Sequence, residues 1–449
     1  MVKSVLASAL FAVSALAASR TTAPSGAIVV AKSGGDYTTI GDAIDALSTS
    51  TTDTQTIFIE EGTYDEQVYL PAMTGKVIIY GQTENTDSYA DNLVTITHAI
   101  SYEDAGESDD LTATFRNKAV GSQVYNLNIA NTCGQACHQA LALSAWADQQ
   151  GYYGCNFTGY QDTLLAQTGN QLYINSYIEG AVDFIFGQHA RAWFQNVDIR
   201  VVEGPTSASI TANGRSSETD TSYYVINKST VAAKEGDDVA EGTYYLGRPW
   251  SEYARVVFQQ TSMTNVINSL GWTEWSTSTP NTEYVTFGEY ANTGAGSEGT
   301  RASFAEKLDA KLTITDILGS DYTSWVDTSY FVDITFRNWF EKESGDISNH
   351  EIEQIFDKSG RIITPDSLKK ALEYQQRNNK ASYVYGNDAL AYGSQGDLNP
   401  LINEISKIIS AAGSFDVKEE RTAASLLQLS GNASDFSYGR NSITLTTSA

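Results

Sequence analysis

The sequence predicts an all-β fold and, within that class, a parallel β-helix. Three observations lead to this prediction. Strand-like runs are short and rich in β-branched and aromatic residues, a unit of about 21 residues recurs, and few helical spans separate the runs. A β-sandwich with a chance repeat is the alternative fold that these observations alone leave open.

The first strand-like runs lie in the N-terminal part of the chain. They cover residues 55–59, 76–80 and 93–97. Ahead of them, residues Thr39, Ile40, Ala43, Ile44 and Leu47 follow helical spacing. Because an open sheet edge invites aggregation, this segment is expected to form a short helix that caps the first coil.

The repeat is clearest where an Asn is closely followed by an apolar residue. Asn126, Asn175, Asn196 and Asn227 fit this pattern, and Gly154 occupies the Asn place in an imperfect copy. The steps from Gly154 to Asn175 and from Asn175 to Asn196 are both 21 residues, and the longer steps of 28 and 31 indicate inserted loops. A strand-rich repeat of this length is typical of a solenoid.

Polar residues follow nearly the same period. Gln139, Gln161 and Asp183 are 22 residues apart, and Asp162 follows Gln161. On a solenoid they would stack on one outer face, about 4.8 Å apart along the axis. Ester cleavage needs a nucleophile, oxyanion donors and an acid, which two carboxyls and two amides can supply. Taken one at a time, each Asp would be interpreted as a turn former or salt-bridge partner, and each Gln as a residue that stacks along the solenoid. The spacing that the four residues share favours a catalytic role instead.

Six ordered segments within residues 30 to about 331 resemble the pectinesterase family. They are Val30–Ile40, Gly62–Glu66, Gln139–Leu143, Gly159–Leu164, Asp183–Gly187 and Leu246–Trp250. The resemblance implies a right-handed parallel β-helix of the pectin lyase-like kind. It also implies hydrolysis of the methyl esters of polygalacturonate to pectate and methanol, in plant cell-wall modification or degradation.

The resemblance also implies residue roles. Asp183 is the expected nucleophile, which forms an acyl-enzyme, and Asp162 is the expected general acid and then general base. Gln161 and Gln139 would stabilise the oxyanion. Arg248 would pair with Asp183 and keep it ionised.

Substrate binding is expected to involve Trp250, stacked on a sugar ring, together with Arg248 and Gln139. The implied mechanism needs no metal and no cofactor. The expected partner is methyl-esterified pectin, and the protein is expected to be a monomer.

Other functions fit the residues less well. A glycosidase pair made from Asp162 and Asp183 would leave the two glutamines and Arg248 without a role, and a lyase is the related alternative. A catalytically inactive polysaccharide-binding β-helix would not need these residues intact. The G-x-G-x-x-G run at 294–299 lacks a βαβ context and is interpreted as a loop.

The net charge and the N-terminal segment restrict the possible binding partners and the cellular location of the protein. The net charge of −26 argues against nucleic acid and against anionic membranes. Residues 1–17 have the n-region, apolar run and Ala-x-Ala site of a secretory signal, so a secreted, extracellular protein is expected. The catalytic domain is expected over residues 26–331, followed by a partly helical extension of unknown role over residues 332–449.

Two covalent features are left open by the sequence. Three cysteines, Cys133, Cys137 and Cys155, allow at most one internal disulfide, and no His-rich set accompanies them to suggest zinc. The three glycosylation sequons begin at Asn156, Asn227 and Asn432.

Overall fold

The computed structural model describes residues 19–331, 382–385, 388–392, 435–439 and 442–446. The chain divides into two compact units, one spanning Ala18–Asp327 and the other made of residues 1–17 and 328–449. The predicted signal segment and most of the extension expected over residues 332–449 lie outside the described residues. Among the described residues, no helix has the length and apolar character needed to cross a membrane.

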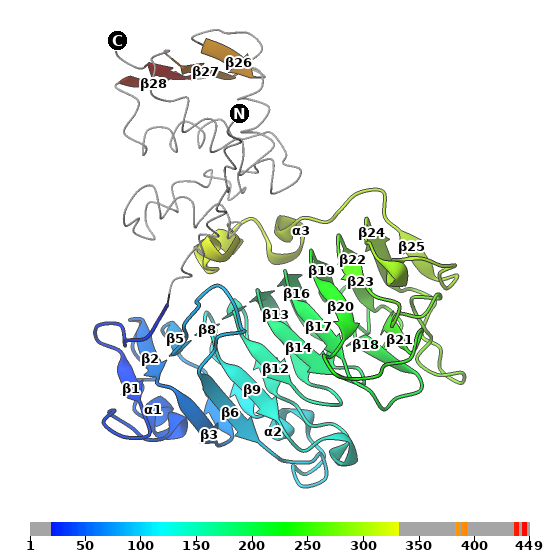
Figure 1. Cartoon of the computed structure of the whole chain (residues 1–449), viewed down its shortest axis with the longest axis horizontal. Helices are drawn as coiled ribbons and strands as arrows, with labels where there is room; N and C mark the ends of the chain where they lie inside the picture. The colour runs from blue at the N-terminus through cyan, green and yellow to red at the C-terminus, as the bar shows by residue number, and fades with distance from the viewer. Residues whose placement is uncertain (1–18, 332–381, 386–387, 393–434, 440–441, 447–449) are drawn as a thin grey trace, which may run out of the picture. The chain divides into compact units, whose positions relative to one another are not determined.

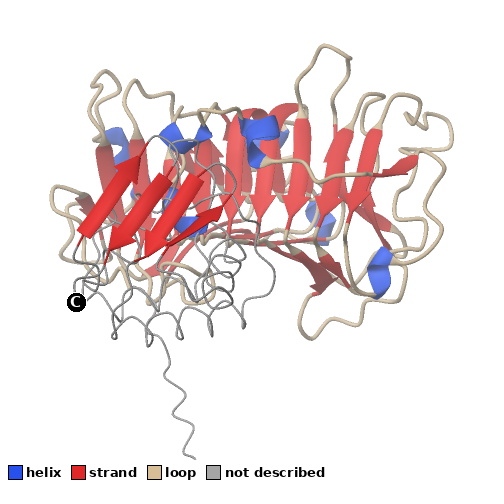
Figure 2. Ribbon diagram, turned by 90° about the horizontal axis from the view of Figure 1, so that it is seen from above, coloured by secondary structure: helices blue, strands red, loops and turns tan. Residues whose placement is uncertain are grey.

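The first unit is a right-handed parallel β-helix with three faces, as the sequence predicted (Figures 1 and 2). The first face consists of β4 (Val68–Leu70), β7 (Phe115–Asn117), β10 (Leu143–Trp146), the start of β13 (Leu164–Ile174), β15 (Ile185–Gly187), β18 (Ala208–Asn213) and β21 (Tyr244–Gly247). The second face consists of β1 (Ile28–Val30), β2 (Gln55–Ile59), β5 (Val77–Gly81), β8 (Gln123–Tyr125), β11 (Gln150–Tyr153), the rest of β13, β16 (His189–Gln195), β19 (Tyr223–Asn227), β22 (Arg255–Gln259), β24 (Thr286–Tyr290) and β25 (Ala305–Lys307). The third face consists of β3 (Gly62–Asp65), β6 (Val94–His98), β9 (Asn128–Asn131), β12 (Asn156–Thr158), β14 (Tyr177–Gly180), β17 (Asp198–Val201), β20 (Thr230–Ala233) and β23 (Ser262–Met263). The strand-like runs predicted at 55–59, 76–80 and 93–97 are β2, β5 and β6, the last two displaced by one residue.

The predicted repeat marks the corner between the second and third faces. Asn126, Gly154, Asn175 and Asn196 all have positive φ there, between 51° and 57°. Asn tolerates this left-handed region better than most residues, which explains its recurrence. Along the corner, Asn196 Nδ2 donates to Asn175 Oδ1 at 2.8 Å.

One member of the predicted repeat was placed wrongly. The left-handed corner residue of the next coil is Lys228, with φ 50°, and not Asn227. Asn227 is the last residue of β19 and pairs in register with Gln195. Its amide donates to Gln195 and accepts from Gln259, at 2.7 and 2.8 Å. Since Asn227 is buried in this amide ladder, the folded chain leaves it inaccessible to a glycan.

The N-terminal cap forms as predicted. Helix α1 (Ile40–Asp45) buries Ile40, Ala43 and Ile44, and Thr39 is its N-cap. The Thr39 hydroxyl accepts from the Asp42 backbone N–H at 3.2 Å, which satisfies one of the free donors of the first turn. The apolar side of α1 therefore covers the interior of the first coil. The other helical elements among the described residues are α2 (Asp109–Thr112), α3 (Ile314–Leu318) and the 3₁₀ turns Gln135–Cys137, Ala295–Ser297, Tyr322–Ser324 and Thr328–Phe331.

The interior is filled by side chains stacked from coil to coil. Tyr152, Tyr173 and Phe194 lie in successive strands of the second face with parallel rings, at centroid distances of 5.0 and 4.7 Å. Their strands pair in register, so like residues come into line along the axis. Such aromatic pairs stabilise by about 0.5–1.5 kcal/mol beyond the area that they bury.

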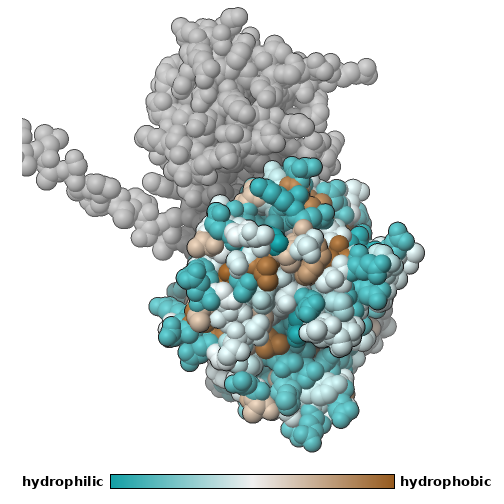
Figure 3. All heavy atoms as spheres, turned by 90° about the vertical axis from the view of Figure 1, so that its right-hand side faces the viewer, coloured by the Kyte–Doolittle hydropathy of each residue, from teal (hydrophilic) through white to brown (hydrophobic). Residues whose placement is uncertain are grey.

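The far end of the helix is protected by a short, charged edge. Strand β25 has only three residues, of which Glu306 and Lys307 are exposed. This end of the unit displays mostly hydrophilic side chains, with hydrophobic ones in small separate areas (Figure 3). Short edge strands with charged residues resist pairing with another chain.

The second unit contains a small four-stranded sheet. Its strands are β26 (Ser382–Tyr385), β27 (Asp388–Tyr392), β28 (Asp435–Gly439) and β29 (Ser442–Thr446). The order is β26-β27-β29-β28, and only β27 and β29 run parallel. The part of the extension that the structure describes is therefore strand, and the partly helical character expected for the extension stays a prediction, since its other residues lie outside the described ranges.

Among the described cysteines, Cys133 and Cys137 form a disulfide and Cys155 is free and buried. The disulfide closes a five-residue loop just before Gln139. Cys155 lies in the core, where burial raises the pKa of its thiol to about 12. The thiol is therefore inert near neutral pH.

Candidate active site

The polar residues that shared a period in the sequence lie on neighbouring coils at the first face. Gln139 pairs with Gln161 through a parallel bridge, and Gln161 pairs in turn with Val182. The predicted stack of Asp183 on Gln161 is therefore wrong by one residue. Asp183 is instead the counterpart of Asp162, and both have positive φ, 49° and 63°. The two carboxyls are thus equivalent positions in successive coils, just ahead of β15 and β13.

Asp183 is held by Arg248, which follows β21. The Arg248 Nε lies 2.9 and 3.2 Å from the two carboxylate oxygens of Asp183, and Nη2 lies 2.6 Å from Oδ2. Asp183 is only 6% exposed. Burial raises the pKa of its carboxyl, and the hydrogen bonds and charge of Arg248 oppose that rise. The fork of Arg248 therefore favours the ionised form and fixes the plane of the carboxylate.

Asp162 has no such cation bound to it within the part of the chain that the structure describes. It is 8% exposed, and burial raises its pKa well above the ordinary value for a carboxyl. The negative charges of Asp183 and Asp109 raise it further, while Arg248 lowers it. Two close carboxyls in such different surroundings divide their protonation unequally, and the larger rise in pKa falls on Asp162.

The side-chain amides of Gln139 and Gln161 lie on adjacent coils at the first face. Both side chains are partly buried, and within the described part of the chain neither amide has a hydrogen-bond partner. Their backbones are tied instead, since the Ala140 N–H donates to the Gln161 carbonyl at 3.1 Å. The amides are thus positioned by the coil and available to a bound molecule.

An apolar floor and an aromatic wall border the carboxyls. Leu141, Leu165, Phe186, Ala212 and Ala113 form a small buried cluster on the outer side of the first face, against which Trp250 and Trp275 pack. Trp250 lies 6.2 Å from Phe186 between ring centroids. A Cβ on Gly214 would lie 2.6 Å from the Trp250 ring, so only glycine admits the indole there. A hydrophobic wall beside polar groups suits the face of a sugar ring.

The sequence analysis missed two residues of this site. Trp275 stacks on the Arg248 guanidinium, with 4.3 Å from Cζ to the ring centroid, and its carbonyl accepts from Nη1 at 3.4 Å. Asp109, in α2, has a buried Oδ1 without a hydrogen-bond partner among the described residues, and its charge contributes to the raised pKa of Asp162. Both come from segments outside the repeat, so no spacing in the sequence pointed to them.

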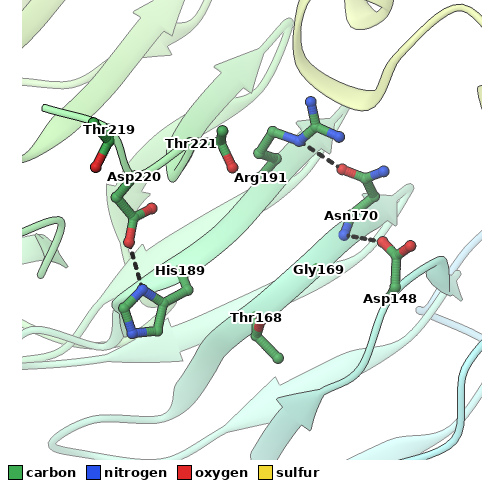
Figure 4. Close-up of a pocket in the computed structure, with 9 residues that line it drawn as sticks. All are labelled: Asp148, Thr168, Gly169, Asn170, His189, Arg191, Thr219, Asp220 and Thr221. Atoms are coloured by element: carbon green, nitrogen blue, oxygen red, sulfur yellow. Dashed lines mark hydrogen bonds and ion pairs between the residues drawn. The ribbon is translucent and has the colours of Figure 1, made fainter. Parts of the chain in front are cut away.

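A separate polar pocket of about 480 Å³ opens between β13, β16 and the loop before β19 (Figure 4). Its polar side chains are largely hydrogen-bonded to one another or to its backbone. His189 Nδ1 lies 2.5 Å from Asp220 Oδ2, Arg191 Nε donates to Asn170 Oδ1 at 2.8 Å, and the Asn170 N–H donates to Asp148 Oδ1 at 2.7 Å. The pocket contains none of the predicted site residues. Within the ranges that the structure describes, no group of three or more His, Cys, Asp or Glu residues is arranged to hold a metal ion.

Comparisons with known proteins show what the chain is similar to. The family model named Pectinesterase matches residues 27–311. A pectinesterase of Aspergillus niger is 74% identical over 330 residues, which is 74% of this chain and 99% of the relative. The crystal structure of a deglycosylated pectin methylesterase from Aspergillus niger superposes with a TM-score of 0.65 at 42% identity, covering 70% of this chain and 100% of the other. A pectin methylesterase variant in complex with a hexasaccharide gives a TM-score of 0.55 at 25% identity, covering 66% and 98%.

A protein of a different kind is also similar to part of this chain. A stretch of 116 residues, 26% of this chain, is 92% identical to 11% of the chromosomal hemolysin of Escherichia coli. The chain spans only this small share of the hemolysin.

Proposed function

The chain belongs to the pectinesterase family, and from this premise we propose that Asp183 and Asp162 cleave the methyl esters of pectin through an acyl-enzyme. Members of the family are carboxylic ester hydrolases that convert methyl-esterified polygalacturonate into free acid and methanol. The observation that carries the proposal is the two-oxygen ion pair of Asp183 with Arg248, set beside an Asp162 whose pKa is raised well above its ordinary value.

Asp183 is the nucleophile. One of its carboxylate oxygens attacks the ester carbonyl carbon at C6 of a galacturonate unit. The attack gives a tetrahedral intermediate whose former carbonyl oxygen carries the negative charge. Arg248 keeps Asp183 ionised in spite of its burial and sets the direction from which it attacks.

Asp162 handles the proton. As the tetrahedral intermediate collapses, the bond to the methoxy oxygen breaks, and Asp162 gives its proton to that oxygen so that methanol leaves. An anhydride then joins Asp183 to the substrate. Asp162, now ionised, takes a proton from water as the water oxygen attacks the C6 carbonyl carbon of the anhydride. The bond from C6 to the Asp183 oxygen breaks, which restores the Asp183 carboxylate and leaves Asp162 protonated. The galacturonic acid released then loses its proton to solvent.

Gln139 and Gln161 stabilise the oxyanion. Their unpaired side-chain amides lie on adjacent coils beside the carboxyls, where they can donate to the oxygen as its charge develops. Trp250 supplies a face for the sugar ring, and Trp275 holds Arg248 in place by stacking on it. Gln139 and Arg248 thus contribute to substrate binding as well as to the reaction.

Product analysis tests this function. The reaction described here releases methanol from pectin without new reducing ends. A glycosidase built on the same two carboxyls would create reducing ends, and a lyase would create unsaturated ends. New ends without methanol would refute the proposal.

Only part of the chain carries the catalytic function. Residues 1–17 form a secretory signal that is removed, residues 26–331 form the catalytic domain, and the mature protein is an extracellular monomer that does not bind membranes. The stretch similar to hemolysin corresponds to the extension over residues 332–449. This assignment is supported by the lengths, since 330 matched residues and 116 matched residues together nearly exhaust the 449-residue chain.

A further inference from the structure

The outer side of the first face continues well beyond the two carboxyls. Tyr69, Arg116, Ser144, Leu165 and Phe186 are consecutive register partners in β4, β7, β10, β13 and β15. Leu165 and Phe186 belong to the apolar floor of the candidate active site. Arg116 is three strands from Phe186, which places it about 14 Å away along the helix axis. A polymer that runs from the carboxyls along the helix axis toward β7 therefore passes over Arg116.

Two cations at this place share one carboxylate. Asp110 accepts from Arg116 Nε and Nη2 at 3.2 and 2.7 Å, and from Lys118 Nζ at 2.7 Å. The Ser144 hydroxyl also donates to Asp110, at 2.7 Å. Burial favours protonation of Asp110, but these hydrogen bonds outweigh it and hold the pKa of the carboxyl below its ordinary value. The group thus carries one surplus positive charge, in a chain whose net charge is −26.

Both cations retain donors for a ligand. Arg116 uses Nε and Nη2 on Asp110, which leaves Nη1 without a protein partner among the described residues. Lys118 uses one of its three ammonium hydrogens on Asp110. A second carboxylate can therefore bind across Arg116 and Lys118 without breaking the existing bonds.

Two exposed aromatic rings flank the cations. Tyr69 is 45% exposed and lies under the Arg116 guanidinium, at 4.7 Å from the ring centroid. Trp146 is 40% exposed, and Lys118 Nζ lies 3.6 Å from its ring centroid. These contacts hold the long cationic side chains in place, which lowers the entropy cost of binding a ligand. Exposed rings of this size beside charged groups are also typical of surfaces that bind sugars.

We propose that Arg116 and Lys118, flanked by Tyr69 and Trp146, form a subsite for a free galacturonate carboxylate of the pectin chain. The subsite lies about three strands from the floor of the active site. This inference rests on the proposed function, because it takes pectin as the polymer on the first face. A methyl ester is neutral and gains little from the two cations, whereas each carboxylate already produced gains a charge-assisted hydrogen bond. The enzyme therefore favours pectin that is partly de-esterified near the bond to be cleaved.

The test compares two substrates in the full chain. Initial rates of methanol release are measured on a fully methylated oligogalacturonate and on one of equal length with free acids toward one end. The double variant Arg116→Gln/Lys118→Gln should lose about tenfold in kcat/KM on the partly de-esterified substrate, through KM, because it gives up about 1.4 kcal/mol of binding. On the fully methylated substrate the loss should stay within about twofold. Lys307→Gln, which removes an exposed cation from β25, should change neither rate.

The possible results distinguish failure of the carboxylate subsite from failure of the proposed function. Equal losses on both substrates, or no loss on either, would overturn the subsite. Calorimetric binding of fully de-esterified oligogalacturonate to the same proteins provides a readout that does not depend on turnover. Weaker binding by the double variant, with methanol absent from every protein including the wild type, would retain a carboxylate subsite and refute the proposed function instead. Equal binding by variant and wild type would refute the subsite.

Discussion

Arg248 donates to both carboxylate oxygens of Asp183, with Nη2 2.6 Å from Oδ2 and Nε 2.9 Å from Oδ1. The two residues are 65 positions apart in the sequence and meet because β15 and β21 lie on the same face of the helix. A planar fork on a carboxylate fixes its orientation as well as its charge. This pair distinguishes the proposed nucleophile from its neighbour Asp162.

Replacing Arg248 should therefore change the pH dependence of kcat/KM. In Arg248→Gln, burial raises the pKa of Asp183 without opposition, so the ionised nucleophile is lost at a higher pH. The acid limb of the profile of kcat/KM against pH should move to higher pH, and the plateau should fall by roughly 10²-fold. Arg248→Lys keeps the charge without the fork, so its limb should move less although its plateau falls. An acid limb that stays in place in Arg248→Gln would show that Asp183 is not the group that titrates there.

Asp109 should influence the alkaline limb of the pH–rate profile, where the proposed general acid Asp162 loses its proton. Its charge contributes to the raised pKa of Asp162, so Asp109→Asn should lower that pKa. The protonated acid is then lost at a lower pH, and the alkaline limb of the pH profile of kcat should move to lower pH. Asp309→Asn, at an exposed carboxylate far along the chain, is the matched control. If both variants keep the alkaline limb of the wild type, Asp109 does not tune Asp162.

Gln161 should act mainly on the transition state. Gln161→Ala removes an amide that has no partner in the resting protein, so folding should be little affected. Loss of one oxyanion donor should lower kcat by about 10²-fold with little change in KM. Steady-state kinetics on pectin separate the two parameters. A rise in KM alone would make Gln161 a group that binds the ground state.

The extension should be dispensable for catalysis. All residues of the proposed site lie within the compact unit Ala18–Asp327. A chain that ends after Phe331 should therefore keep kcat/KM within about twofold of the full chain, as expected when a distant segment shares no partners with the site. Rates of methanol release and thermal unfolding of the two chains provide the comparison. An unfolded or inactive shortened chain would show that the extension contributes to the β-helix.

The periodic part of the architecture was predictable, and the exceptions have physical reasons. Asn175 and Asn196 recur at 21 residues because a corner residue must adopt positive φ in every coil. The prediction failed at Asn227 because Lys228 takes that conformation in a longer coil, and the Asn serves an amide ladder instead. Where another residue replaces Asn at a corner, a search for regularly spaced Asn residues cannot locate that corner.

The proposed site was partly predictable for the same reason. Gln139 and Gln161 follow the repeat and come together, whereas Asp183 lies one residue out of the predicted register. Trp275 and Asp109 arrive from inserted segments whose course depends on tertiary packing. The position of Arg116 relative to the apolar floor could not be predicted, because the alignment of Arg116 with Ser144, Leu165 and Phe186 depends on the strand register, which the structure defines.

Methanol release by an Asp183 variant tests the central claim most directly. Asp183→Ala and the near-isosteric Asp183→Asn are compared with the wild type on citrus pectin, with circular dichroism to verify the fold. Since the carboxylate is the proposed nucleophile, both variants should lose on the order of 10³-fold or more in kcat while remaining folded. Activity within about tenfold of the wild type in a folded Asp183→Ala protein would contradict the acyl-enzyme mechanism.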